Sequence, residues 1–370
     1  MREGEERRAE DARRRALGRR WLPGIVAAFL GALGLLAVVC LHFPAWTTTP
    51  ELRAIYPMAL VRTAIATGLA AAFAIGALAV LLDRGRRLGL AGLVLAGAAQ
   101  LAGGASVEVA LPVARRSHLG LDWFVLDLFL LALVAVPIER AFAQRPAQPV
   151  FRRGWRTDLA HFFASHVLVS VLSLLVIAPA LLLFRVAGSP ALQAAVAAQP
   201  LALQLAEIVL VADLSGYAAH RLFHTVPALW RFHAVHHSSE AMDWLAGSRL
   251  HLVDVVATRA AVFAPLFLLG FAHAALTAYL VWVALHATWI HANLRFRYGP
   301  LEHVLATPRF HHWHHAAERE ARDKNFAVHL PFIDRVLGTY HLPDGRWPER
   351  YGIDEPMPAG WLGQLAAPFR

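Results

Sequence analysis

Three short clusters of histidine share helical spacings along this chain. Residues i, i+3 and i+4 lie on one face of an α-helix, so the imidazoles of each cluster can reach the same place. Adjacent imidazoles cannot all be protonated without strong repulsion, whereas neutral imidazole is a good ligand for iron, zinc, copper or nickel. We therefore interpret the clusters as metal ligands. They consist of His220 and His224, of His233, His236 and His237, and of His311, His314 and His315.

A further pair, His286 and His291, lies at the end of the last apolar segment. Eight clustered histidines and this pair make ten candidate ligands, which is too many for one metal ion. The set suits two metal ions, each with four or five nitrogen ligands, at the roughly 3.5–4 Å separation of two-metal sites. Soluble di-iron bundles use Glu-x-x-His ligands. That motif does not occur in this sequence, so the site would consist of histidine.

The composition is that of a membrane protein. Hydrophobic residues make up 57% of the 370 residues and charged residues 16%, against roughly 45–50% and 25% in soluble domains. The mean hydropathy is +0.47. These values exclude a disordered protein, a coiled coil and most soluble enzymes. Cys40 is the only cysteine, which excludes an intrachain disulfide, a cysteine-ligated zinc site and a bound iron–sulfur cluster.

Apolar segments of bilayer-spanning length predict an all-α, polytopic helical bundle of about eight spans. A helix needs about 20 residues to cross the hydrocarbon core. The last two segments are tightly joined, and they form either two spans or a hairpin that enters only part way. The segments are Gly24–Phe43, Met58–Leu82, Leu90–Val113, Trp123–Pro137, Ala160–Phe184, Leu201–Tyr217, Leu252–Phe271 and Ala274–Ile290.

Residues 144–149 read as a linker, because they contain two prolines and no apolar run. We therefore divide the chain into a membrane region of about four spans at 1–150, a catalytic domain at 151–345 and a tail at 346–370. The sequence does not indicate a function for the first region.

The net charge of +9 comes mostly from arginine in short loops, which favours membrane orientation over nucleic-acid binding. We number the loops by the apolar segment that each follows. The second and fourth loops, at 83–89 and 139–156, hold more arginines than the first and fifth, which have Arg53 and Arg185 alone. Arg115 and Arg116 in the third loop are the exception. The positive-inside rule then places both termini and all histidine clusters on the cytoplasmic side. The abundance of arginine and alanine favours a bacterial source, and hence the inner membrane.

The histidine motifs resemble those of the membrane fatty acid hydroxylase/sterol desaturase superfamily, over about Asp158–Tyr340. The stretch 213–224 is similar to D-x3-Y-x2-H-R-x2-H, and 307–315 is similar to T-P-x-x-H-x-x-H-H. The segments 233–239, 291–293 and 325–339 also carry family-like elements. The first 150 residues lie outside the resemblance.

The resemblance implies two iron ions, O2 and external electrons from a separate ferredoxin or cytochrome/reductase, acting on a lipid in the membrane. The reaction would be hydroxylation or desaturation of a fatty acyl, sterol-like, carotenoid or ether lipid. Nine of the candidate histidines carry over as ligands. His286 fits less well, because its five-residue spacing from His291 turns the two side chains about 140° apart on a regular helix.

Two residues of the first motif, Asp213 and Tyr217, are candidates for a catalytic role, because a carboxylate inside a span is costly and usually functional. Glu240, Asp243 and Glu302 are further acids that could orient the imidazoles. His251 and His312 fall outside the ligand pattern, and we expect them beside the site rather than in it.

Two other functions remain open from the residues alone. A membrane metal-binding or transport protein would use histidines as a conduit, but it would distribute them through the bilayer. A zinc-dependent lipid hydrolase would use the same ligands without redox chemistry. Zinc could also substitute for iron at the site, which would leave a protein without oxidase activity.

Overall fold

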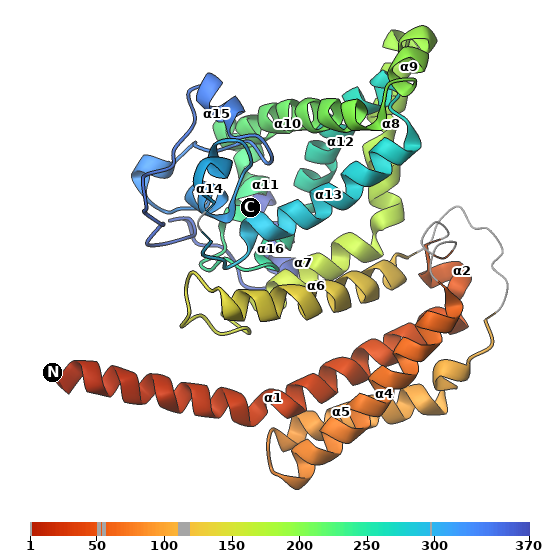
Figure 1. Cartoon of the computed structure of the whole chain (residues 1–370), viewed down its shortest axis with the longest axis vertical. Helices are drawn as coiled ribbons and strands as arrows, with labels where there is room; N and C mark the ends of the chain where they lie inside the picture. Colours follow the sequence, from red (N-terminus) through yellow and green to blue (C-terminus); the bar gives the residue numbers. More distant parts are fainter. Residues whose placement is uncertain (1, 50–52, 54–56, 110–118, 297) are drawn as a thin grey trace. The chain divides into compact units, whose positions relative to one another are not determined.

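The computed structural model describes residues 2–49, 53, 57–109, 119–296 and 298–370, without the side chains of 2–20, 169 and 170. The regular elements of the described residues are all helices (Figure 1), and extended pairing there is limited to the isolated bridges Ala143↔Leu294 and Ala316↔Tyr351. The chain divides into two units, Met1–Leu130 and Leu131–Arg370. Arg115 and Arg116, which contributed to the predicted orientation, lie outside the described residues.

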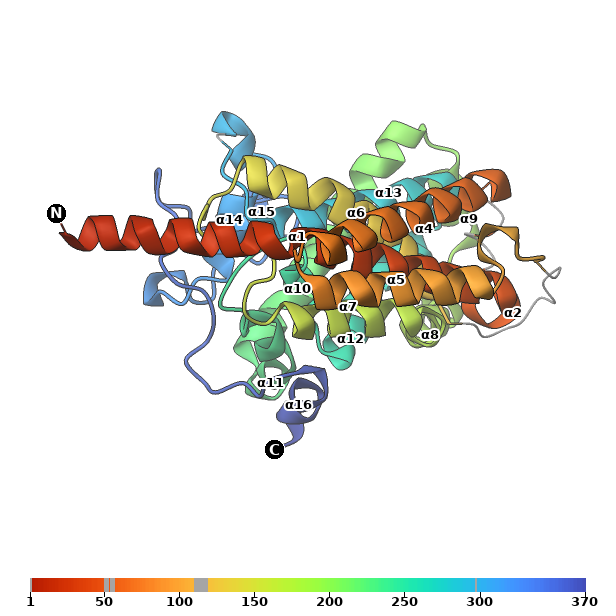
Figure 2. The ribbon, with the colours of Figure 1, turned by 90° about the horizontal axis from the view of Figure 1, so that it is seen from below.

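Three long helices build the first unit, and Figure 2 shows them side by side: α1 (Arg2–His42), α4 (Met58–Leu81) and α5 (Arg86–Leu101). Small residues let α1 and α5 approach closely. A Cβ added to Gly92 would lie 2.5 Å from the backbone of Ala27, so this contact requires glycine. Such small-residue contacts are typical of helices that associate in lipid.

Two short elements complete the first unit, α2 (Pro44–Thr47) and the 3₁₀ turn η1 (Gly104–Ser106). Helix α6 (Leu121–Ala141) begins in this unit. Its Asp122 carboxylate accepts hydrogen bonds from the backbone N–H of Thr49 at 2.9 Å and from the Thr49 hydroxyl at 3.0 Å. This contact fixes the start of α6 against the end of α2.

The second unit contains the long helices α10, α12 and α13, which pack through a core that includes Ile208, Leu266 and Tyr279. Its helices are α7 (Trp155–Val167), α8 (Val169–Ala187), α9 (Pro190–Ala197), α10 (Leu201–Thr225), α11 (Pro227–His237), α12 (Leu252–Leu269), α13 (His273–His291), α14 (Pro308–His314), α15 (Phe332–Val336) and α16 (Trp361–Ala366).

Seven of the described helices are long and apolar enough to cross a membrane, and the bent pair α7–α8 is an eighth candidate. The prediction of an all-α protein with about eight spans is therefore confirmed. The predicted span Ala160–Phe184 differs in shape, because its two helices meet at 60°. The predicted span Leu90–Val113 is helical only as far as Ser106, and residues 110–113 lie outside the described part.

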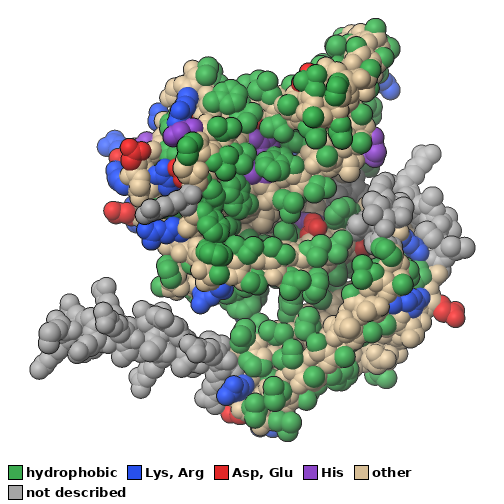
Figure 3. All heavy atoms as spheres, in the orientation of Figure 1, with side chains coloured by type: hydrophobic (Ala, Val, Ile, Leu, Met, Phe, Trp, Pro, Cys, Tyr) green, Lys and Arg blue, Asp and Glu red, His purple; other side chains and the backbone are tan. Residues whose placement is uncertain are grey.

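The surface of the second unit is divided by chemistry. Hydrophobic side chains cover its long helices in Figure 3, whereas charged side chains gather at the end that carries α14 and α15. This division suits a protein whose helices lie in lipid while its last segments meet water.

Residues 144–149, which the sequence suggests as a linker, are held within the second unit. The Arg145 N–H donates to the side-chain oxygen of Asn293 at 2.9 Å, and the Gln148 amide donates to the Met242 carbonyl at 2.8 Å. The C-terminal tail also packs on this unit, since Gln364 contacts the ring of His161 at 3.0 Å.

Candidate metal centre

Four helices bring the candidate histidines to one end of the second unit (Figure 1). α10 and α11 carry the first two clusters, α13 ends at His291, and α14 carries the third. The local sequence explains where α14 begins, because Thr307 caps it by accepting from the Phe310 N–H at 3.4 Å and Pro308 occupies its first turn. The T-P pair therefore sets the start of the helix that presents His311 and His314.

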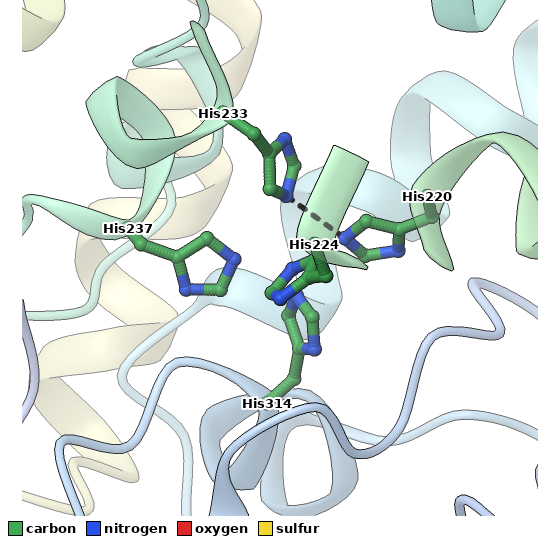
Figure 4. Close-up of side chains that lie close together, drawn as sticks. All are labelled: His220, His224, His233, His237 and His314. Carbon is green, nitrogen blue, oxygen red and sulfur yellow. Dashed lines mark hydrogen bonds between the residues drawn. The ribbon is translucent and has the colours of Figure 1, made fainter. Parts of the chain in front are cut away.

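Nine of the ten predicted ligands form two groups. Within each group, one ring nitrogen per residue lies within 4.8 Å of the others. The first histidine group, shown in Figure 4, draws its side chains toward one point from α10, α11 and α14. The second histidine group takes its side chains from α11, from α13 and from α14 together with the residue that caps the end of α14. The first group is His220, His224, His233, His237 and His314, and the second is His236, His291, His311 and His315.

Backbone carbonyls determine which nitrogen of several rings is free for a metal. The Nδ1 atom of His220 lies 2.8 Å from the Phe326 carbonyl, and that of His314 lies 2.8 Å from the Lys324 carbonyl. His291 Nδ1 lies 2.6 Å from the carbonyl of Ala287. Since a carbonyl only accepts, each of these Nδ1 atoms carries the proton, and the Nε2 lone pair faces the group.

The arrangement leaves several of these lone pairs without a donor. His233 donates from Nδ1 to the Asp254 carboxylate at 2.7 Å, so its Nε2 is a lone pair that faces Nε2 of His220 at 3.0 Å. The Nε2 atoms of His224, His237 and His314 are buried without a hydrogen-bond partner among the described residues. A metal cation satisfies all of these atoms at once, so the donor set fits a metal.

The protonation state also suits metal binding. Burial, followed by the charge of neighbouring histidines, holds the pKa of the ligands on α11 and around α14 well below 6.5. A histidine with such a pKa is neutral at pH 7 and can donate its lone pair. The residues concerned are His233, His236, His237, His311, His314 and His315.

His286 lies outside both groups, in contrast to its predicted place among the ligands. Helix α13 continues regularly to His291, so the five-residue spacing turns His286 to another side. Its Nε2 lies 3.0 Å from the Ala306 carbonyl and its Nδ1 lies 3.0 Å from Nδ1 of His329. Its ring stacks on Trp282.

Asp213 and Tyr217 do not contact the ligand nitrogens. They contact residues 324–339, a loop that includes the short helix α15. The Asp213 carboxylate accepts the backbone N–H groups of Val328, His329 and Leu330 at 2.7, 3.1 and 2.6 Å. The Tyr217 hydroxyl lies 2.8 Å from that of Thr339. Both therefore position the loop whose carbonyls orient His220 and His314.

A second acid, Asp334, braces the same loop from within. Its carboxylate accepts the N–H groups of Phe326 and Ala327 at 2.8 and 2.9 Å and the Thr339 hydroxyl at 2.7 Å. Asn325 has a left-handed backbone with φ of 59°, and it donates from its side chain to the Phe310 carbonyl at 2.9 Å. These contacts tie the loop to α14.

Other acids proposed to orient the ligands pair with arginine instead. Asp243 binds Arg152 at 2.7 Å, and Glu302 binds Arg309. Glu240 is exposed and lies 3.2 Å from Arg153. The two histidines expected beside the site have separate contacts. His251 caps α12 by accepting from the Val253 N–H, and His312 contacts the His291 carbonyl at 3.2 Å.

Sequence reasoning did not identify Asp254, the carboxylate that holds His233. The available signal was an acid in the apolar segment 252–271, which is costly in a span. The acid Asp158 was also missed. It is fully buried and pairs with Arg152 at 2.8 Å and Arg249 at 2.5 Å, and the Arg249 carbonyl receives Nδ1 of His236 at 3.1 Å.

Two cavities reach the histidine groups. The larger, about 430 Å³, lies between α10, α12 and α13 and has mainly apolar walls, with His220, His233, His236, His291 and His311 among its lining residues. The smaller, about 240 Å³, touches the first group at His224, His237 and His314 and is lined by polar residues that include Arg322 and Asp323. The larger cavity, with its mainly apolar walls, suits the chain of a lipid.

Comparison with known proteins agrees with this arrangement. Residues 205–339 match the family model described as fatty acid hydroxylase. The ornithine lipid hydroxylase OlsE of Rhizobium tropici is 36% identical over 174 residues, which cover 46% of this chain and 51% of that protein. The alkylglycerol monooxygenases of Homo sapiens and Danio rerio are 31% and 34% identical over 145 residues, 39% of this chain and 32% of each relative.

The chain thus spans about half, or less, of the length of these relatives. No solved structure is significantly similar to the chain. The matched residues contain the histidine pair of α10, the three histidines of α11, His291 and the cluster around α14. The histidine-bearing part of this chain belongs to the fatty acid hydroxylase/sterol desaturase superfamily.

Proposed function

We propose that this chain is an integral membrane enzyme that hydroxylates a lipid with O2, two bound iron ions and electrons from a separate protein. The observation that carries the proposal is the meeting of two groups of buried histidines with a mainly apolar cavity. The names of the relatives, an ornithine lipid hydroxylase and alkylglycerol monooxygenases, support a lipid that has a polar head group as the substrate.

In this proposal, each histidine group holds one iron ion through its Nε2 atoms. Iron supplies the redox chemistry with O2 that oxidation of an unactivated C–H bond requires and that no side chain provides. Asp254 and the carbonyls of Phe326, Lys324 and Ala287 keep the imidazoles in the tautomer that ligation needs. Asp213 and Tyr217 act as positioning residues through the loop 324–339.

The cavity between α10, α12 and α13 would hold the lipid chain and exclude water from the reacting carbon. Such positioning converts the encounter of lipid and oxidant into a reaction between neighbours. Lipid can enter from the bilayer, because the helices that line the cavity are candidate membrane spans.

We place the termini and the histidine groups on the cytoplasmic side of a bacterial inner membrane, on the arginine distribution of the loops. A ferredoxin or a cytochrome/reductase on that side would supply the electrons. The smaller cavity gives the first histidine group a polar approach distinct from the apolar one.

The alternatives predict different arrangements or metals. A metal transporter needs ligands distributed along its path, whereas nine histidines here gather in two adjacent groups. A zinc hydrolase would use the same cavity but would work without O2.

The test is lipid mass spectrometry under ¹⁸O2, in membranes that contain either the wild-type chain or the His314→Ala/His315→Ala variant, with a reductase and iron supplied. Hydroxylation predicts a lipid that gains ¹⁸O only with the wild type. Loss of two hydrogens without label would make the enzyme a desaturase. Identical lipids in both membranes would contradict the proposal. His303→Ala is the matched control, because His303 is exposed and lies outside both groups.

A further inference from the structure

Helix α12 carries an arginine that the mechanism above does not use. This span has a mean hydropathy of 1.9, and its two charged residues are Asp254 and Arg259. Asp254 is engaged by His233 and by the Thr258 hydroxyl at 2.9 Å. Within the described part of the chain, Arg259 has neither a hydrogen bond nor an ion pair. An unpaired charge inside a span is costly and calls for a counter-ion.

Arg259 faces the larger cavity. The residues of α12 that line this cavity recur in adjacent pairs every four positions, and they form one continuous stripe along the helix. The stripe consists of Asp254, Val255, Thr258, Arg259, Val262 and Phe263. Arg259 has accessible surface and lines the cavity, although protein surrounds its guanidinium closely. The guanidinium is therefore available to an occupant of the cavity.

The acids that line the cavity are already engaged. Asp254 binds His233, and Asp213 accepts three backbone N–H groups of the loop 324–339. Across the cavity, the Tyr279 hydroxyl lies 3.4 Å from Nε2 of His329. Neither of these carboxylates is thus left to neutralise Arg259.

Arg259 places a positive charge on α12 at a defined distance from the carboxylate that holds the candidate ligand His233. Asp254, which holds His233, precedes Arg259 by five residues, or about 7.5 Å along the helix axis. A guanidinium presents a planar fork that matches carboxylate and phosphate oxygens. A group bound by this fork would lie deeper along α12 than the histidine end of the cavity.

We propose that Arg259 binds the anionic group, a carboxylate or phosphate, of the lipid that occupies this cavity. Through this ion pair, Arg259 would determine which part of the lipid lies beside the histidine groups. Binding of the anionic group by Arg259 does not depend on the reaction. Its effect on which part of the lipid lies beside the histidine groups rests on the proposed hydroxylase function.

The test compares matched charged and neutral probes bound to the purified full-length chain, measured by native mass spectrometry. Oleate against oleyl alcohol probes the carboxylate, and dioleoylphosphatidic acid against dioleoylglycerol probes the phosphate. The wild type should prefer at least one anionic probe by roughly ten- to a hundredfold, the range of a hydrogen bond to a charged group. The arm with the larger preference identifies the source of the anion.

Arg259→Gln should remove this preference, and Arg259→Lys should retain part of it. Arg185→Gln is the matched control, because Arg185 is an exposed arginine at the end of α8 outside the cavity. The metal content of each variant reports whether the site is intact. Equal binding of charged and neutral probes by the wild type, or an unchanged preference in Arg259→Gln, would overturn the proposal.

Binding is measured without turnover, so the result separates this inference from the proposed function. If the chain hydroxylates lipid, Arg259→Gln should also spread the product over more than one carbon position. A chain that prefers anionic probes but yields no oxidised lipid would retain the ligand site and reject the hydroxylase.

Discussion

Nδ1 of His233 lies 2.7 Å from a carboxylate oxygen of Asp254, and this pair connects the candidate metal ligands of α11 to helix α12. The pair orients the imidazole and makes it a better ligand. The same helix then lines the mainly apolar cavity with Val255 and Phe263. One helix thus supports the candidate metal centre at one end and lines the cavity along its length.

Replacing Asp254 by asparagine should weaken metal retention by about 10- to 100-fold, as for other residues that support metal-bound histidines. The measurement is the iron left on the purified protein during titration with a chelator. Glu240→Gln is the control, because Glu240 is an exposed acid that pairs with Arg153 at the surface. Equal retention in both variants would show that Asp254 does not support the ligand.

Gly247 leaves room for a ligand ring. A Cβ at this position would lie 2.8 Å from Nδ1 of His291, so Gly247→Ala should displace the imidazole and lower the metal content of the second histidine group. Gly216→Ala is the matched control, since its Cβ would meet only Val262, at 3.6 Å. Metal analysis of both variants tests this difference. Full metal content in Gly247→Ala would mean that His291 can move without loss of binding.

Asp213→Asn should destabilise the loop 324–339, because a buried acceptor of three N–H groups is replaced by a neutral amide that also donates. The expected loss is about 1–3 kcal/mol of unfolding free energy, measured by thermal denaturation in detergent. Hydrogen exchange at residues 328–330 should rise with it. Asp344→Asn, at an exposed position, should leave both unchanged. Unaltered exchange in Asp213→Asn would remove the positioning role.

The metal-free protein should become less stable as the pH falls. The folded-state pKa values of His236 and His237 lie well below 6.5 because of burial, so the unfolded chain binds protons that the folded chain does not. Below about pH 6.5, each such histidine costs up to about 1.4 kcal/mol per pH unit until its folded pKa is reached. Thermal denaturation of chelator-treated protein between pH 7.5 and 5.5 checks the sign, and a midpoint that rises on acidification would contradict it.

The sequence predicts the fold well where the signal is local. Apolar length identifies the spans, and helical spacing places pairs such as His220 and His224 on one face. It does not predict the 60° bend between α7 and α8, because the apolar run continues across the junction at Leu168. Whether His286 faces the other candidate ligands depends on whether α13 stays a regular helix as far as His291, and the sequence does not determine this.

Contacts between distant segments lie beyond sequence reasoning. The carbonyls of Phe326 and Lys324 orient His220 and His314 across 106 and 10 residues of chain. A backbone carbonyl has no residue type that could reveal this role. Asp254 and Arg259 did carry a signal, since each is a charged residue in an apolar span.

The most direct test of the central claim is the metal content of the purified protein, measured by elemental analysis together with Mössbauer spectroscopy. We predict two iron ions per chain in the wild type, and about one when His224 of the first group or His315 of the second is replaced by alanine. Protein that is supplied with iron during expression but contains only zinc or no metal, or variants that keep the full iron content, would contradict the account.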